Sequence, residues 1–348
     1  MVRVREAIAT LPPGAFAFVM ATGIVSIGMA QQDLPTLSLA LLVVAGVAWL
    51  LLMVLLVLRV CWYRDRVVAD LHDPRLAFGY FTLIAGTDVL AVRLTEEHLD
   101  TGVALLAFAT SVWLVLGYAV PWAAVLSRAR RPVLSEANGT WFIWVVAGQS
   151  VATAAASIEP LVPVGQAEVA VLAVAAWSVG IVLYGACAVL VALRLMLYPL
   201  SPSDLDPPYW VSMGAMAITV VAGAKIVEMT STPIVLATGG LIAGLAVLCW
   251  AWATWLIPVL VAVGVWRHWV HRIPLRYEAS WWSIVFPLGM YAVAGMYLGR
   301  ADALPIVEQI GAVWLWLAVA AWLCAASLMV RSWFGPRERV DARVASPS

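Results

Sequence analysis

The sequence predicts an all-α integral membrane protein whose ten transmembrane helices form five hairpins around a central pore. Three observations support this prediction: the composition, the length of the apolar runs and the distribution of the basic residues. Hydrophobic residues make up 64% of the 348 residues, charged residues make up 11%, and the mean hydropathy is +0.96. A soluble domain carries roughly 25% charged residues, so the composition excludes an ordinary soluble fold.

The apolar residues are grouped into runs that are long enough to cross the hydrocarbon core of a bilayer, which is about 30 Å thick. Backbone N–H and C=O groups in lipid must be satisfied within the segment, so each run predicts a helix. Short connections with turn residues separate the runs. In chain order the predicted helices cover residues 13–31, 36–60, 75–93, 101–126, 140–158, 168–197, 208–228, 234–264, 281–299 and 306–332.

The basic residues alternate between the connections, which supports both the helix count and the orientation. If the N-terminus is cytoplasmic, 17 of the 20 Lys and Arg fall on that side, and only Arg93, Lys225 and Arg300 fall on the other. Basic residues are retained on the cytoplasmic side of a membrane. We therefore expect a multi-pass protein of the cell membrane with both ends in the cytoplasm. We also expect residues 1–334 to form one transmembrane domain and residues 335–348 to form a short disordered cytoplasmic tail.

The odd-numbered runs resemble one another and differ from the even-numbered runs. Each odd run opens with aromatic residues at its cytoplasmic end, at positions 16, 80, 141, 209 and 281. The even runs are rich in Leu, Val, Ala and Trp, as helices that face lipid are. The odd runs carry most of the polar or helix-breaking residues at mid-membrane depth, namely Thr22, Ser26, Thr87, Asp88, Gln149, Ser150, Thr153, Thr219 and Pro287. Such residues face the bundle interior or a cavity, so we place the odd helices inside and the even helices outside.

This repeat divides the chain into five hairpins. Residues 13–31 fit as the first odd helix, which argues against the alternative that they form a cleaved signal peptide behind Arg3 and Arg5. The five hairpins cover about residues 13–60, 75–126, 140–197, 208–264 and 281–332.

Small and helix-breaking residues recur about two turns into the odd runs. A single glycine at such a position is explained by close helix packing. The aligned set instead predicts a pore or cavity with exposed backbone at one depth, as in transporters with broken helices. The residues that we expect along this path are Thr22, Gly23, Thr87, Gly148, Gln149 and Met216.

Ionisable residues inside the predicted membrane region are the strongest indication of mechanism. Asp88 lies deep in the third run, Arg93 follows near its outer end, and Lys225 and Glu228 lie toward the outer end of the seventh run. A charge in hydrocarbon is costly unless it is paired or hydrated. Two interpretations stay open: Asp88 lies near Lys225 or Arg93 and couples a proton to transport, or these residues form a structural ion pair.

Three segments resemble the tellurite-resistance/C4-dicarboxylate transporter family. Residues 18–27 (FVMATGIVSI) resemble its first-helix signature, residues 85–90 (AGTDVL) its third helix, and residues 281–287 (WWSIVFP) its ninth. That family contains TehA-like proteins, yeast malate and sulfite transporters, and plant slow anion channels. The resemblance implies ten helices in five hairpins with the odd helices lining the pore, and a homotrimer.

The resemblance also implies a function in transport. Within the family, C4-dicarboxylates such as malate are the best-known cargo of the carriers, and sulfite, chloride, nitrate or tellurite-related efflux are alternatives. In the channel members a phenylalanine on the ninth helix closes the pore. Phe286, beside Pro287, is its best match, and the alternative is an ordinary apolar residue in a membrane helix.

Other functional classes find little support in the residues. A membrane enzyme needs clustered His, Asp or Ser at membrane depth, and a sensor or assembly factor usually carries an added soluble domain. No metal-ligand spacing, phosphate loop, cofactor motif or nucleic-acid motif is evident, so we expect no enzyme activity, no cofactor, no metal and no nucleic-acid partner. The expected partners are small inorganic or carboxylate anions, the lipid bilayer and further copies of the chain.

Overall fold

The computed structural model describes residues 2–127, 132–230, 232–275 and 277–334, and every regular element in these ranges is a helix. This confirms the predicted all-helical membrane fold. Nine helical spans in the described ranges are long and apolar enough to cross a membrane, and α2 (Ala17–Gln31) is a shorter apolar helix of 15 residues. The predicted tail over residues 335–348 lies outside these ranges, as do Arg128, Arg130, Arg131 and Arg276.

Five inner helices form a closed ring. Around the ring α2 packs against α5, α5 against α7, α7 against α9, α9 against α11, and α11 against α2 again. In the spans that contain α5, α7, α9 and α11, between 83% and 89% of the most apolar window is buried. The four inner helices that join α2 are α5 (Thr82–Thr95), α7 (Phe142–Ile158), α9 (Val211–Val227) and α11 (Trp282–Ala301).

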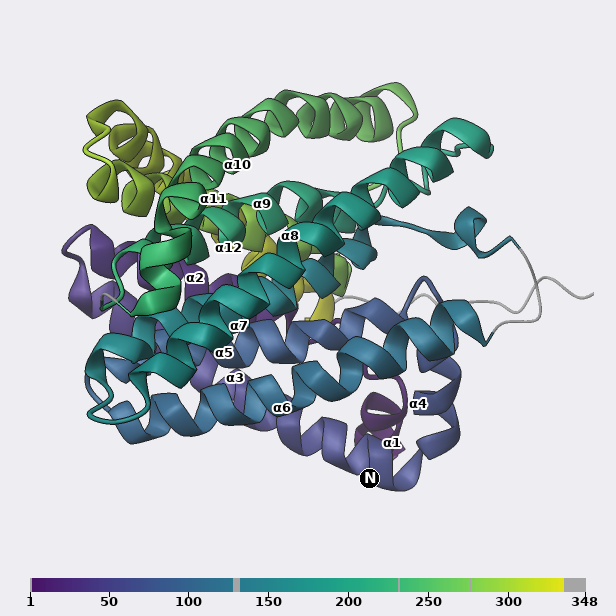
Figure 1. Ribbon diagram of the computed structural model, residues 1–348. Helices are drawn as coiled ribbons and strands as arrows, with labels where there is room; N and C mark the ends of the chain where they lie inside the picture. The colour runs from purple at the N-terminus through teal and green to yellow at the C-terminus, as the bar shows by residue number, and fades with distance from the viewer. Residues whose placement is uncertain (1, 128–131, 231, 276, 335–348) are drawn as a thin grey trace, which may run out of the picture.

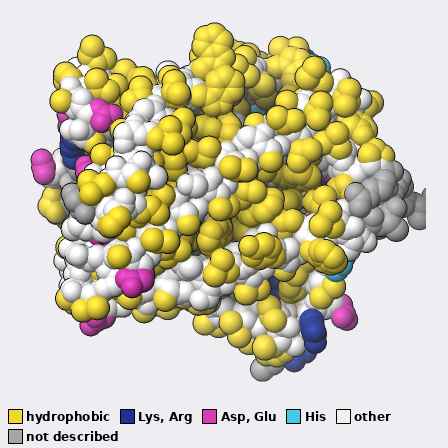
Figure 2. Space-filling model, in the orientation of Figure 1, with side chains coloured by type: hydrophobic (Ala, Val, Ile, Leu, Met, Phe, Trp, Pro, Cys, Tyr) yellow, Lys and Arg dark blue, Asp and Glu magenta, His cyan; other side chains and the backbone are white. Residues whose placement is uncertain are grey.

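Five longer helices surround this ring, and each packs against the inner helix that precedes it in the chain. Only 6% to 28% of their apolar windows is buried, because their remaining faces point away from the bundle. Figure 1 shows α10 along the top of the bundle and α6 along its lower side, and Figure 2 shows apolar side chains over most of this face. The outer helices are α3 (Pro35–Trp62), α6 (Leu99–Pro121), α8 (Gln166–Leu197), α10 (Pro233–Val265) and α12 (Pro305–Phe334).

Four of the five aromatic residues predicted at the starts of the odd runs lie in short 3₁₀ turns that lead into the inner helices, and the fifth, Phe16, is the N-cap residue of α2. Phe78 packs against Trp141, with ring centroids 5.1 Å apart, so the aromatic starts of neighbouring inner helices contact one another. Gly139 crosses the backbone of Pro208 so closely that a Cβ atom would overlap it. The four turns are η1 (Ala77–Phe81), η4 (Gly139–Trp141), η6 (Pro207–Trp210) and η8 (Ala279–Trp281).

Short elements complete the ends of the bundle. The outer helices α6 and α10 continue into single π-helical turns, and α1 and α4 lie beside each other near the N-terminus (Figure 1). These elements are α1 (Val2–Ala9), α4 (Arg64–Leu71), η2 (Trp122–Leu126), η3 (Val133–Glu136), η5 (Glu159–Leu161) and η7 (Trp266–Val270).

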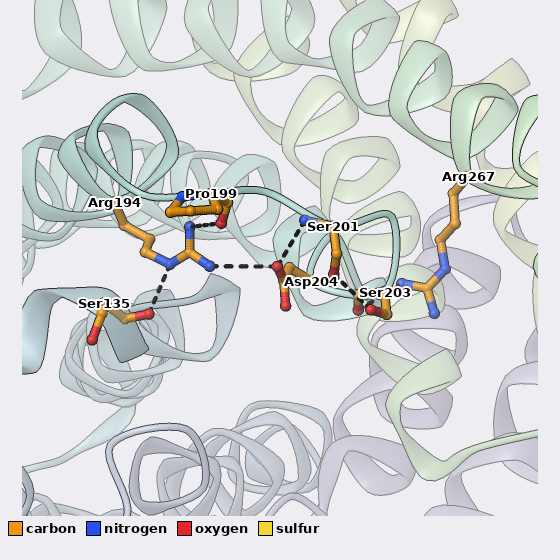
Figure 3. A network of polar contacts seen from close by, with 7 residues as sticks. All are labelled: Ser135, Arg194, Pro199, Ser201, Ser203, Asp204 and Arg267. Atoms are coloured by element: carbon orange, nitrogen blue, oxygen red, sulfur yellow. Dashed lines mark hydrogen bonds and ion pairs between the residues drawn. The ribbon is translucent and has the colours of Figure 1, made fainter.

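We call the end of the bundle at which the inner helices begin the arginine-rich side. Buried arginines at this end form hydrogen bonds and ion pairs with residues of the segments that connect the helices. Arg59 forms an ion pair of 2.7 Å with Asp70, which also accepts a hydrogen bond from Tyr80. Arg194 donates to the carbonyl oxygens of Ser135 and Pro199, at 2.8 and 3.2 Å, and reaches Asp204 at 3.5 Å (Figure 3). These contacts fix the loops that position the inner helices.

Candidate functional site

A narrow cavity lies on the axis of the inner ring, toward the side opposite the arginine-rich side. All five inner helices contribute to its wall, which is mostly aliphatic. Five of its side chains are polar or aromatic, namely Asp88, Ser150, Thr153, Lys225 and Tyr297. The aliphatic part of the wall consists of Ile24, Ile27, Val89, Val92, Ile218, Val221, Met290 and Val293. We name this space the central cavity.

Asp88 is the buried acid of the central cavity. Its side chain is 1% exposed, and one carboxylate oxygen accepts a hydrogen bond of 2.8 Å from the hydroxyl group of Ser150 on α7. The other oxygen, Oδ1, is buried and has no hydrogen-bond partner among the described residues. Asp88 therefore has free acceptor capacity in surroundings where an unpaired polar atom is costly.

Lys225 is the basic residue of the central cavity and the only lysine in the chain. Positions 218, 221 and 225 lie on one face of α9, because residues three, four and seven apart share a helix face. The Nζ atom lies 4.4 Å from the ring centre of Tyr297 on α11, in a cation–π contact. No carboxylate in the described part of the chain forms an ion pair with Lys225, so its charge faces the cavity unpaired.

Of the other charged residues predicted in the membrane region, Lys225 shares the cavity of Asp88, whereas Arg93 and Glu228 lie elsewhere. Asp88 and Lys225 line the same cavity, in agreement with one of the two predicted placements. Arg93 instead points to the mouth of the bundle, where its Nε donates to the hydroxyl group of Ser38 at 3.2 Å and Nη1 lies 3.9 Å from Glu97. Glu228 is exposed at the end of α9.

A second, more polar pocket adjoins the central cavity at this mouth. The two share Ile27, Val92 and Tyr297, and the pocket is also lined by Gln31, Arg93, Glu96, Glu97 and Arg300. Arg300 binds Glu308 at 2.8 Å and the carbonyl oxygen of Gln31 at 3.1 Å. The lining of this second pocket carries two arginines and two glutamates, so the mouth is close to neutral. The charges deeper in the bundle are those of Lys225 and Asp88.

Phe286 lies one helical turn from the central cavity, toward the arginine-rich side. It is fully buried, and it precedes the wall residue Met290 by four positions, which places both on one face of α11. The buried residues that lie one turn before a wall residue in the other inner helices are Met20, Ala85, Val146 and Gly214, and we refer to these positions with Phe286 as the Phe286 layer. A Cβ atom on Gly214 would lie 2.9 Å from the ring of Pro287, so only glycine leaves room for the proline ring there.

Two of the threonines predicted to line the path point away from it. Thr22 accepts a hydrogen bond of 3.0 Å from Trp322 of the outer helix α12, and Thr87 accepts one of 2.9 Å from Trp49 of α3. Their hydroxyl groups therefore connect the inner ring to the outer helices. The prediction that Thr22 and Thr87 line the path is therefore corrected. The physical reason is that a side chain of a neighbouring helix can form a hydrogen bond with a buried hydroxyl group as well as water in a pore can.

Gln149 and the two predicted glycines are corrected in the same way. The amide nitrogen of Gln149 donates to the carbonyl oxygen of Trp177 in α8, at 3.1 Å, and Gly148 faces Trp113 of α6. A Cβ atom on Gly23 would overlap Val89, so this glycine allows close packing of α2 on α5. Met216 is buried outside the lining of the central cavity.

A set of tryptophans at mid-helix in the outer helices makes these contacts, and the sequence analysis did not single these residues out. Trp177 donates to the carbonyl oxygen of Thr219, at 3.1 Å, and the ring of Trp250 stacks on Tyr291 at 6.3 Å. The signal that predicts them is their spacing, because one such residue recurs in each outer helix at intervals of 64 to 73 residues. The five are Trp49, Trp113, Trp177, Trp250 and Trp322.

The described residues hold no group of three or more His, Cys, Asp or Glu side chains that could bind a metal ion. What the site offers chemically is one buried carboxyl group and one cation in an aliphatic space, because the hydroxyl groups of Ser150 and Thr153 donate to Asp88 and to the carbonyl oxygen of Gln149, at 2.8 Å each. This set suits weak binding of a small charged species.

Comparisons with known proteins agree with this arrangement. A model of the SLAC1 family, described as voltage-dependent anion channel, matches residues 10–330 of the chain. The chain is 25% identical over 319 residues to an uncharacterized transporter of Methanocaldococcus jannaschii, which covers 89% of the chain and 90% of that relative. It is 60% identical over 140 residues to an uncharacterized membrane protein of Mycobacterium tuberculosis, which covers 40% of the chain and 71% of that relative.

Proposed function

The chain belongs to the SLAC1 family of voltage-dependent anion channels, and from that premise we propose that it moves small anions through the central cavity. The observation that carries the proposal is the position of the cavity, which all five inner helices enclose and which contains the single lysine of the chain. A passage for ions must bind them weakly enough to release them. One cation in an aliphatic wall meets this requirement better than a cluster of arginines.

Phe286 and Pro287 form the gate in this proposal. In this proposal the Phe286 layer lies between the central cavity and the arginine-rich side, and Phe286 is the only aromatic residue among the five positions assigned to it. The facing residues in that layer are alanine, valine, methionine and glycine, so the phenyl ring fills the space between them. Removing the ring opens a continuous passage.

Two classes of cargo stand within this proposal. C4-dicarboxylates such as malate follow from the family resemblance, as do sulfite, chloride, nitrate and tellurite-related efflux. The narrow cavity and its single lysine support the smaller anions, because a dicarboxylate brings two charges to one cation. We propose transport rather than catalysis as the activity of the chain.

The proposed setting is the cell membrane, with both ends of the chain in the cytoplasm. The excess of arginine on one side supports this orientation. Cysteine-reactive labelling of an engineered site in the connection before α4, in intact and in permeabilised cells, tests it: labelling only after permeabilisation is expected.

A homotrimer is proposed from the resemblance alone. The mass of the purified protein, measured with its detergent subtracted, is expected to equal three chains, and a mass of one chain contradicts this proposal.

The function itself is tested by anion efflux from liposomes that contain the purified protein. We expect chloride efflux through Phe286→Ala to exceed that through the wild type by at least about tenfold, since the passage no longer closes. The matched control is Phe108→Ala, which removes a phenyl ring from the exposed face of α6 and is expected to leave efflux unchanged. If none of the three proteins releases any anion tested, the proposed function is wrong; if only the Phe286→Ala increase is missing, the gate assignment is wrong.

A further inference from the structure

Asp88 and Lys225 face one small cavity without forming an ion pair with each other. The Asp88 carboxylate is bound at one oxygen by Ser150, and the Lys225 ammonium group lies over the ring of Tyr297. Both groups keep unused capacity: the Oδ1 atom of Asp88 has no partner, and the ammonium group has no carboxylate partner among the described residues. The cavity therefore contains one acid and one base whose charges balance across it.

Among the described residues that line the central cavity, Asp88 and Lys225 are the only charged ones. The contributions of α2 to the wall are Ile24 and Ile27, those of α7 are Ser150 and Thr153, and α11 contributes two aliphatic residues and Tyr297. Beyond Asp88, α5 adds only valines, and beyond Lys225, α9 adds Ile218 and Val221. The nearest further charges lie in the mouth, on Arg93, Glu96, Glu97 and Arg300.

This charge balance determines what the cavity can accept. While Asp88 is ionised, an anion that enters adds an unbalanced negative charge to an aliphatic space, which is costly. Once Asp88 is protonated, the cavity carries one positive charge, and one monovalent anion restores neutrality. A dianion would again leave one negative charge unpaired.

We propose that the central cavity is a binding site for one monovalent anion, that the Asp88 carboxylate competes with this anion for the charge of Lys225, and that the anion therefore binds together with a proton on Asp88. This inference rests on the proposed function and adds its regulation: anion occupancy rises as the pH falls. Protonated Asp88 also becomes a hydrogen-bond donor, so its own hydroxyl group is available to the anion.

Chloride efflux from liposomes, measured from about pH 9 to about pH 5, tests the competition. Wild-type efflux is expected to rise by about tenfold for each pH unit while Asp88 titrates, and then to level off. Asp88→Asn carries no negative charge, so its efflux is expected to stay at the high plateau at every pH. Asp100→Asn is the matched control, because Asp100 is exposed at the start of α6 and is expected to leave the wild-type pH profile unchanged.

The outcomes separate this inference from the proposed function. Efflux that keeps its pH profile in Asp88→Asn overturns the inference and leaves anion transport standing. Malate efflux equal to chloride efflux overturns the selection for monovalent anions. If no anion crosses through any variant at any pH, the proposed function fails as well.

A second measurement needs no variant and so does not depend on the folding of Asp88→Asn. When chloride is added to the purified wild-type protein in a weakly buffered detergent solution, we expect uptake of about one proton for each chloride bound. Chloride binding without proton uptake at any pH tested overturns the inference.

Discussion

At the arginine-rich side, Arg59, Arg194 and Arg267 donate hydrogen bonds to carbonyl and carboxylate groups of nearby segments. Lys225, near the other end of the axis, instead faces an aliphatic cavity. Arg267, for example, donates to the carbonyl oxygen of Leu205 at 2.7 Å, and Arg194 is held by three partners (Figure 3). Lys225 instead lies over the ring face of Tyr297. Basic residues thus stabilise the fold at one end and remain available to a ligand at the other.

The largest expected effect on transport separates these two uses of charge. Lys225→Gln removes the only cation of the central cavity, so chloride efflux in liposomes is expected to fall at every pH by at least about tenfold, a factor that corresponds to about 1.4 kcal/mol. Lys225→Arg keeps the charge and is expected to retain efflux. Thermal unfolding of both variants is expected to stay close to that of the wild type; undiminished efflux through Lys225→Gln breaks the comparison.

The opposite result is expected at the arginine-rich side. Arg194→Met leaves the carbonyl groups of Ser135 and Pro199 without their donor and removes the charge beside Asp204, and the loss of stability is on the order of 3 kcal/mol. Thermal unfolding in detergent measures it. Arg300→Met, at the exposed ion pair with Glu308, is the matched control and is expected to change stability by less than about 1 kcal/mol. Equal losses in the two variants would show that the arginine-rich side has no special role in stability.

A smaller effect comes from Asp206, in the connection before α9. Burial raises the pKa of its carboxyl group to about 6, against the nearby positive charge of Arg267. Because this pKa is higher in the folded protein than in the unfolded chain, the folded state binds more protons between about pH 4 and pH 6, and stability falls as the pH rises through that range. Asp206→Asn is expected to remove this decline and to stabilise the protein above it by about 1 to 3 kcal/mol.

Asp204 provides the contrast for that measurement. The backbone N–H group of Ser201 and the charge of Arg194 lower the pKa of its carboxyl group. Its contribution is therefore present above the pKa of the unfolded chain and is lost as the pH falls. Thermal unfolding over this pH range is expected to show opposite slopes for the contributions of Asp204 and Asp206, and identical pH profiles for Asp206→Asn and the wild type would contradict the assignment.

The smallest expected effect concerns the polar residues that point outward. Thr22→Val and Thr87→Val each leave a tryptophan N–H group without its acceptor, at a cost of about 0.6 kcal/mol and at most about 2 kcal/mol. Thermal unfolding should register this loss, while chloride efflux is expected to stay at the wild-type level. A change in anion selectivity in either variant would show that its threonine lines the passage and would contradict the outward placement.

The sequence was sufficient for the membrane fold, because composition, run length and the alternation of arginines each depend on the bilayer rather than on packing. It was also sufficient to find Asp88 and Lys225, since an ionisable residue in an apolar run stands out at any depth. The sequence was not sufficient to predict which way a polar side chain points, toward an outer helix or into the cavity. Thr22 and Asp88 look alike as polar residues at mid-depth, yet one faces Trp322 on an outer helix and the other faces the cavity.

Direction depends on contacts between residues that are far apart in the chain. Trp322 and Thr22 are 300 positions apart, and the sequence around neither residue predicts the hydrogen bond between them. Tyr297, which holds Lys225, looks like an interfacial aromatic residue in the sequence because it lies near the end of its run. Its place in the cavity follows only from the closing of the ring between α9 and α11.

The position of a bound anion tests the central claim most directly. Crystals of the purified protein that contain bromide, measured at the bromine absorption edge at about pH 5 and about pH 9, locate the ion by its anomalous signal. The account predicts a bromide peak in the central cavity between Lys225 and Ser150 at the lower pH, and a weaker peak or none at the higher pH. Bromide bound only at other places, with the central cavity empty at both pH values, would contradict it.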